Sequence, residues 1–68
     1  MSPEEESQMR QKLHELQVEH RDLDDIIERL SQHGDVDQLQ LVRLKKRKLS
    51  LKDAIVRIES KIIPNILA

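Results

Sequence analysis

Three histidines are the side chains of this sequence best suited to bind zinc or to move a proton near neutral pH. His14 and His33 lie six and thirteen residues from His20. Neither distance is the spacing of about four that places two imidazoles on one helical face for zinc. The chain has no cysteine, so it can form neither a thiolate zinc site nor a disulfide. We therefore predict no metal site and no cofactor.

The sequence patterns of other catalytic chemistry are also missing. With one glycine, the chain has no glycine-rich phosphate loop, and no serine stands in the setting of a nucleophile. The acidic side chains follow surface faces and do not converge on a pocket. A two-helix protein also offers little of the concave surface that a small-molecule site requires. We expect this protein not to be an enzyme.

One run of basic residues could contact phosphate groups. It comprises Lys45, Lys46, Arg47 and Lys48, and Lys52 extends it over about two helical turns. Consecutive residues on a helix point in different directions, so only part of the run can face one polyanion. The sequence has no aromatic residue to stack on a base, and its net charge is −1. We favour neutralisation of the run by an acidic helix, with nucleic-acid binding as the alternative.

The elements that position these residues follow from composition and from signals at helix ends. Of 68 residues, 37% are charged, one is glycine and two are proline, which suits long helices better than a β-barrel. Ser2, Pro3 and Glu5 match the N-cap, first-turn proline and N3 glutamate of a helix start. We predict a single domain, residues 1–68. Within it, helix one covers about 3–32, a turn about 33–36, helix two about 37–62, and a short C-terminal tail follows.

The predicted turn has its own signals. Gly34 is expected to follow helix one in the left-handed conformation. Asp35 is the expected N-cap of helix two, or Asp37 if the turn is looser. Pro64 ends helix two, because proline cannot continue a helix interior.

Each predicted helix carries one seam of residues at the alternating spacing of three and four that is typical of coiled coils. The first seam is Met9, Leu13, Leu16, His20, Leu23, Ile27 and Leu30, and the second is Leu41, Leu44, Lys48, Leu51, Ile55, Ile58 and Ile62. In an antiparallel hairpin the two seams meet in seven layers, from Leu30 with Leu41 at the turn to Met9 with Ile62. The alternative, one continuous rod, must pass through Gly34 and change the phase of the seam. We predict an all-α, antiparallel two-helix hairpin of the coiled-coil type.

Charge favours the same hairpin. Residues 1–30 hold nine acidic and four basic side chains, a net charge of −5, whereas residues 35–63 hold eight basic and four acidic, a net charge of +4. The helices therefore attract each other. At the flank of the seam the register places Asp24 beside Lys45, an exposed pair of small energetic value.

Two polar residues, His20 and Lys48, interrupt the seams in adjacent layers. Such a polar layer usually fixes the register and the number of partners at some cost in stability. The ammonium group of Lys48 can reach out of the seam toward Asp24 or Asp22. We favour this structural role over a metal-binding or pH-sensing role for His20.

Helix two carries a second apolar stripe, formed by Val42, Leu49, Val56 and Ile63 at a spacing of seven. Each follows a seam position by one residue, about 100° around the helix, where helix one cannot cover all of it. A chain of 68 residues is a marginal domain, and burying each aliphatic would contribute roughly 1.5–3 kcal/mol. We predict self-association through this stripe into a helical bundle, a homodimer above all, with another protein partner as the alternative.

The longest unbroken apolar runs have two or three residues, so we expect no membrane span. The acidic N-terminal segment also lacks the pattern of a signal peptide. We expect a cytoplasmic protein.

Two segments resemble the YdcH-like family of short bacterial proteins of unknown function, which pairs H-x-x-L-D with a later L-K-K-x-K-L-x-L-K-D. The matching positions are His20, Leu23 and Asp24, then Leu44, Lys45, Lys46, Lys48, Leu49, Leu51, Lys52 and Asp53. The resemblance covers roughly residues 13–60. It implies a small helical hairpin in the bacterial cytosol, with no activity, cofactor or partner to carry over. The expected function is that of a non-enzymatic interaction or structural module.

Overall fold

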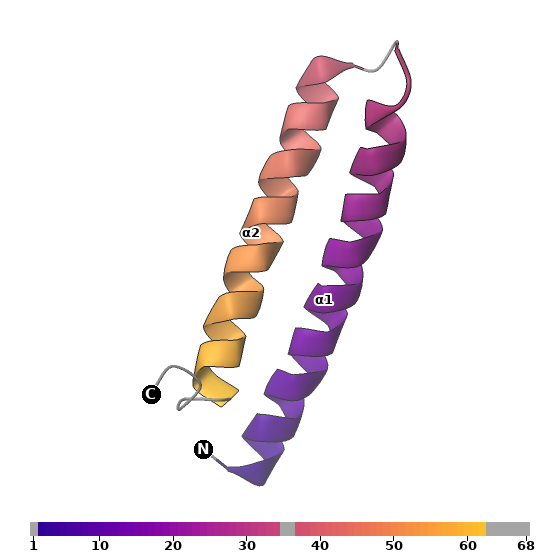
Figure 1. The fold of residues 1–68 in the computed structure, drawn as a ribbon. Coiled ribbons are helices and arrows are strands. Elements are labelled where there is room, and N and C mark those ends of the chain that lie inside the picture. The colour runs from indigo at the N-terminus through magenta and orange to yellow at the C-terminus, as the bar shows by residue number, and fades with distance from the viewer. Residues whose placement is uncertain (1, 35–36, 63–68) are drawn as a thin grey trace.

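The computed structural model describes residues 2–34 and 37–62 of the 68-residue chain. This part consists of two helices, α1 (Pro3–Ser31) and α2 (Gln38–Ile62), and contains no strand. Figure 1 shows α1 and α2 side by side, running in opposite directions and joined at one end. The all-α, hairpin-like prediction is confirmed, and the continuous rod is excluded.

The start of α1 is held by its cap. The hydroxyl oxygen of Ser2 accepts a hydrogen bond from the backbone N–H of Glu5 at 3.2 Å. Pro3 takes the first helical position, where its missing N–H costs no hydrogen bond. Glu4, Glu5 and Glu6 occupy the first turn, where the helix dipole favours negative charge.

The end of α1 differs from the prediction. The backbone N–H groups of Gln32 and His33 donate to the carbonyls of Arg29 and Leu30, both at 3.2 Å. These bonds satisfy the last carbonyls of the helix in a tightened final turn. The left-handed conformation predicted for Gly34 is therefore wrong, because Gly34 has no positive φ.

The start of α2 follows the looser of the two predicted turns. The carboxylate of Asp37 accepts a hydrogen bond from the backbone N–H of Leu39 at 3.0 Å, which makes Asp37 the N-cap. The predicted roles of Asp35 and Pro64 lie outside the described residues.

The core follows the two predicted seams. Its buried side chains are 4–8% exposed and comprise Leu23, Ile27, Leu41, Leu51 and Ile55. The other nine seam positions are all half-buried. Elsewhere in residues 2–34 and 37–62, the half-buried residues are Glu6, Ala54 and Glu59. None of the described side chains is fully buried, so the hairpin has a thin core that is exposed along its edges.

Candidate interaction surface

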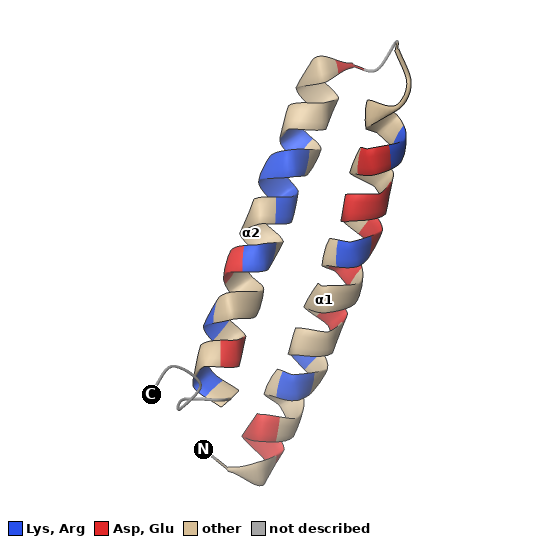
Figure 2. Cartoon of the chain, viewed as in Figure 1, with Lys and Arg blue, Asp and Glu red and all other residues tan. Residues whose placement is uncertain are grey.

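Helix α2 is strongly basic. Between Gln38 and Ile62 it carries eight basic and two acidic side chains, whereas α1 carries nine acidic and four basic ones. Figure 2 shows most of the blue positions on α2 and most of the red positions on α1. The two helices therefore attract each other along the hairpin, and each presents its own sign of charge to the solvent.

Residues of α1 neutralise only part of the predicted basic patch. Arg47 contacts Glu19 across the hairpin at 3.2 Å. Lys45, Lys46 and Lys52 are exposed. Within the described residues, these three lysines form no ion pair. Helix α1 thus neutralises Arg47, whereas three lysines stay available on the surface of α2 for contact with another molecule.

Sequence reasoning missed Glu19 as the partner of Arg47. Glu19 and Arg47 each precede a seam position by one residue, since His20 and Lys48 follow them. In an antiparallel pair, positions with this offset lie on the same side of the seam. The offset could have placed both side chains on one flank of the hairpin, although it does not single out Arg47 as the partner.

The polar residues of the seam lie together with Asp24. Lys48 is half-buried, with 34% of its side chain exposed, and its ammonium group contacts the Asp24 carboxylate at 2.7 Å. This contact replaces the expected pairing of Asp24 with Lys45. His20 occupies the next layer and is half-buried. The predicted reach of Lys48 toward Asp24 is therefore present, whereas the role of this polar layer in fixing the register stays a prediction.

The contact with Lys48 changes the titration of Asp24. The hydrogen bond from Lys48, followed by its positive charge, lowers the pKa of the Asp24 carboxyl below its ordinary value, and the charge of His20 acts in the same direction. The folded protein thus binds this proton more weakly than the unfolded chain. The contribution of Asp24 to stability is present above the unfolded pKa and is lost as the pH falls through the lower, folded pKa.

We therefore expect Asp24→Asn to lower the melting temperature at pH 7 by a few degrees. The shift should be small because 57% of the Asp24 side chain is exposed. The difference between variant and wild type should shrink as the pH falls through the lowered pKa of the wild-type Asp24, because the wild-type carboxyl then loses its charge as well. Circular dichroism melts across this range measure the effect. Asp25→Asn is the control, because exposed Asp25 makes no ion pair within the described residues. Equal shifts in both variants would contradict the role of Lys48.

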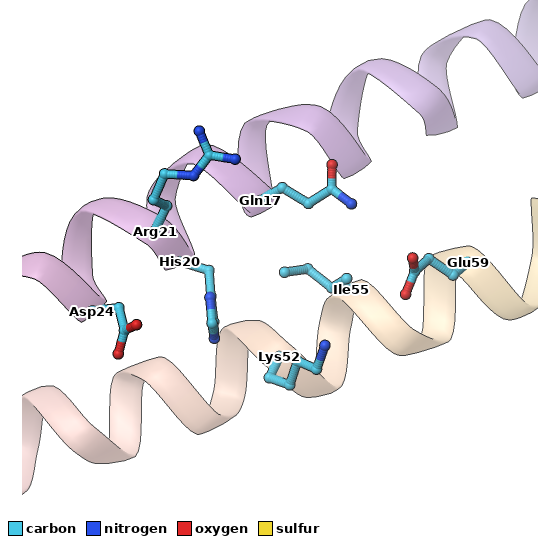
Figure 3. A pocket seen from close by; sticks show the side chains of 7 residues that line it. All are labelled: Gln17, His20, Arg21, Asp24, Lys52, Ile55 and Glu59. Atoms are coloured by element: carbon cyan, nitrogen blue, oxygen red, sulfur yellow. The ribbon is translucent and has the colours of Figure 1, made fainter.

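An open groove of about 430 Å³ runs between the helices beside this polar layer. It is lined by Gln17, His20, Arg21, Asp24, Lys52, Ile55 and Glu59. In Figure 3, His20 and Asp24 extend from α1 toward α2, whereas Arg21 points away from it. Lys52 and Glu59 bring opposite charges from α2 to the same groove. Because both signs of charge line it, the groove favours neither an anion nor a cation.

In residues 2–34 and 37–62, no group of three or more His, Asp or Glu side chains could hold a metal ion. No described helix is long and apolar enough to cross a membrane.

The predicted apolar stripe lies on the outer surface of α2. Its described members, which we call the α2 stripe, are Val42, Leu49 and Val56, with exposed fractions of 47%, 67% and 50%. Its fourth predicted member, Ile63, lies outside the described residues. Leu39, near the start of α2, is 59% exposed and was missed, because it stands outside the spacing of seven. The α2 stripe and the three available lysines thus share one helix.

Comparison with known proteins places the chain in a family. The profile of the family described as protein of unknown function (DUF465) matches residues 13–59, well over half of the chain. This is the YdcH-like family, and the matched residues include both the polar layer and the whole basic run. No curated protein and no solved structure matches the chain. With both of its motifs on a two-helix hairpin, this chain belongs to the DUF465 family.

Proposed function

We propose that this protein is a non-enzymatic interaction module, a helical hairpin that self-associates through the α2 stripe. The observation that carries the proposal is the exposure of Val42, Leu49 and Val56, which ranges from 47% to 67%. These aliphatics repeat every seven residues along a single helix face that α1 does not cover. The expected setting, implied by the family resemblance, is the bacterial cytoplasm.

The size of the core supports self-association. At this length a single core rarely supplies more than about 3–5 kcal/mol. The hairpin buries five hydrophobic side chains and leaves four others exposed on α2, three of them in the α2 stripe. Covering the α2 stripe with a second copy would add apolar burial of the kind that the hairpin lacks. A homodimer is the smallest assembly that achieves this.

Nucleic-acid association is the alternative. It would use Lys45, Lys46, Arg47 and Lys52 of α2. We favour it less because Arg47 is engaged by Glu19 and because α1 adds a strongly acidic surface close by. A mobility shift of nucleic acid that weakens steeply with salt would favour this alternative.

We expect Leu49→Glu to abolish self-association. Leu49 is the most exposed member of the α2 stripe, and a carboxylate there would have to lose its water on binding. Sedimentation equilibrium or light scattering at micromolar concentration should give more than 8.0 kDa for the wild type and 8.0 kDa for the variant.

Ser50→Glu is the matched control, because Ser50 is the next residue on α2, is exposed and receives the same charge. It should keep the wild-type mass. A wild-type protein that stays at 8.0 kDa up to high micromolar concentration would refute the proposed function.

A further inference from the structure

We infer that the α2 stripe of one copy docks on the outer face of α1 of a second copy, with Leu49 seated beside Val18. The inference rests on the proposed self-association and names the surface of the second copy that receives the stripe. Its basis is the shape and charge of two exposed surfaces on opposite helices.

The receiving surface on α1 is a shallow hollow beside an exposed aliphatic residue. Val18 lies midway between the seam residues Leu16 and His20, so it points away from α2, and it is 42% exposed. The hollow, of about 450 Å³, is lined by His14, Glu15, Val18, Glu19 and Asp22, and we call it the α1 hollow. Ile26, also 42% exposed, lies about two turns farther along the helix, beyond Asp22.

The projecting surface on α2 matches the α1 hollow in charge. Lys45 and Lys46 precede Leu49 by four and three residues, and Lys52 follows it by three, so all three lysines neighbour Leu49 on the helix surface. The α1 hollow presents the carboxylates of Glu15 and Asp22 beside Val18, and a third, Glu19, that already contacts Arg47 of its own hairpin. Leu49 also has Asp53 four residues after it, and that carboxylate pairs with Arg57. A leucine with three neighbouring lysines thus faces a valine with neighbouring carboxylates.

The net charges of the helices favour this contact over one between two copies of α2. Each α2 carries eight basic and two acidic side chains, so pairing two of them brings like charges together. Each α1 carries nine acidic and four basic side chains. Packing α2 on the α1 of a second copy therefore repeats between copies the charge attraction between α1 and α2 of one hairpin.

The contact is head-to-tail, because it joins two different surfaces. One copy can use its α2 stripe and its α1 hollow with two different neighbours. The mean mass should therefore continue to rise with protein concentration beyond that of a dimer, unless a ring closes. Salt should weaken the contact, because it screens the attraction between lysines and carboxylates.

A complementation experiment with two full-length variants tests the inference. Val18→Lys disables the α1 hollow, and Leu49→Glu disables the α2 stripe. Each variant alone should stay at 8.0 kDa in sedimentation velocity. A mixture should form a species of about 16 kDa, twice the mass of one chain, and nothing larger, because each variant supplies the one surface that the other lacks and the resulting dimer has no working surface left. Gln17→Lys is the control for added charge, because Gln17 faces the groove between the helices.

Other outcomes separate this inference from the proposed function. If Val18→Lys associates like the wild type while Leu49→Glu does not, the α2 stripe pairs with itself, and the inference fails while the proposed function stands. The inference also fails if both variants are monomeric and their mixture does not associate, or if salt strengthens the wild-type assembly. A monomeric wild type refutes the proposed function itself.

Discussion

Replacing Leu51 with alanine is expected to unfold most of the protein at 25 °C. Leu51 is 4% exposed and packs in the cluster that contains Leu23, Ile27 and Leu41. Truncating a buried leucine typically costs about 2–5 kcal/mol, which includes the energy of the cavity that remains. A single core of this size rarely supplies more than about 3–5 kcal/mol, so the loss removes most of the stability. The helical circular dichroism signal should fall accordingly.

Leu49→Ala is the matched control, with the same substitution two residues earlier on the same helix. Leu49 is 67% exposed, so its truncation should change the stability of the isolated hairpin by no more than about 0.5 kcal/mol. Urea unfolding, followed at a concentration where the wild type is a monomer, separates hairpin stability from association. Similar midpoints for the two variants would contradict the assignment of the core to the seams.

The seams could be predicted because many apolar residues in each helix share the same spacing. Each helix repeats its apolar positions over about six turns, and one exception in each seam does not change the phase. The turn depends on a few residues, and there the prediction failed in part. Gly34 permits a left-handed conformation but does not require one, because backbone bonds from Gln32 and His33 already satisfy the end of α1.

Of the candidate surfaces, some features could be predicted from the sequence and others could not. The exposure of Val42, Leu49 and Val56 follows from helical spacing alone, so it could be predicted. The sequence does not distinguish Lys45 from Lys48 as the partner of Asp24, because the two lysines lie three residues apart on the same helix. The half-buried Lys48 must carry its charge out of an apolar layer, which favours the nearby carboxylate. The hollow beside Val18 depends on side-chain conformations, which sequence spacing does not determine.

Replacing Lys48 with leucine is expected to stabilise the hairpin. Lys48 occupies a seam position opposite Leu23, where a leucine side chain would bury apolar area that the lysine headgroup cannot. Leaving Asp24 without its partner costs little, because its side chain is 57% exposed and stays hydrated. We expect a gain of about 1 kcal/mol, or a rise in melting temperature of roughly 4–8 °C. Lys46→Leu is the control, because exposed Lys46 lies outside the seam and should give no such gain.

The same substitution should make the assembly less uniform. With leucine at position 48, the α2 seam from Leu41 to Ile62 becomes wholly aliphatic, and nothing in it distinguishes one register from another. Shifted hairpins and contacts between seams of different copies then become competitive, because each buries similar area. Sedimentation velocity should show a broader mass distribution for Lys48→Leu than for the wild type or Lys46→Leu. A large loss of stability, or an unchanged distribution with higher stability, would contradict the role of Lys48 in fixing the register.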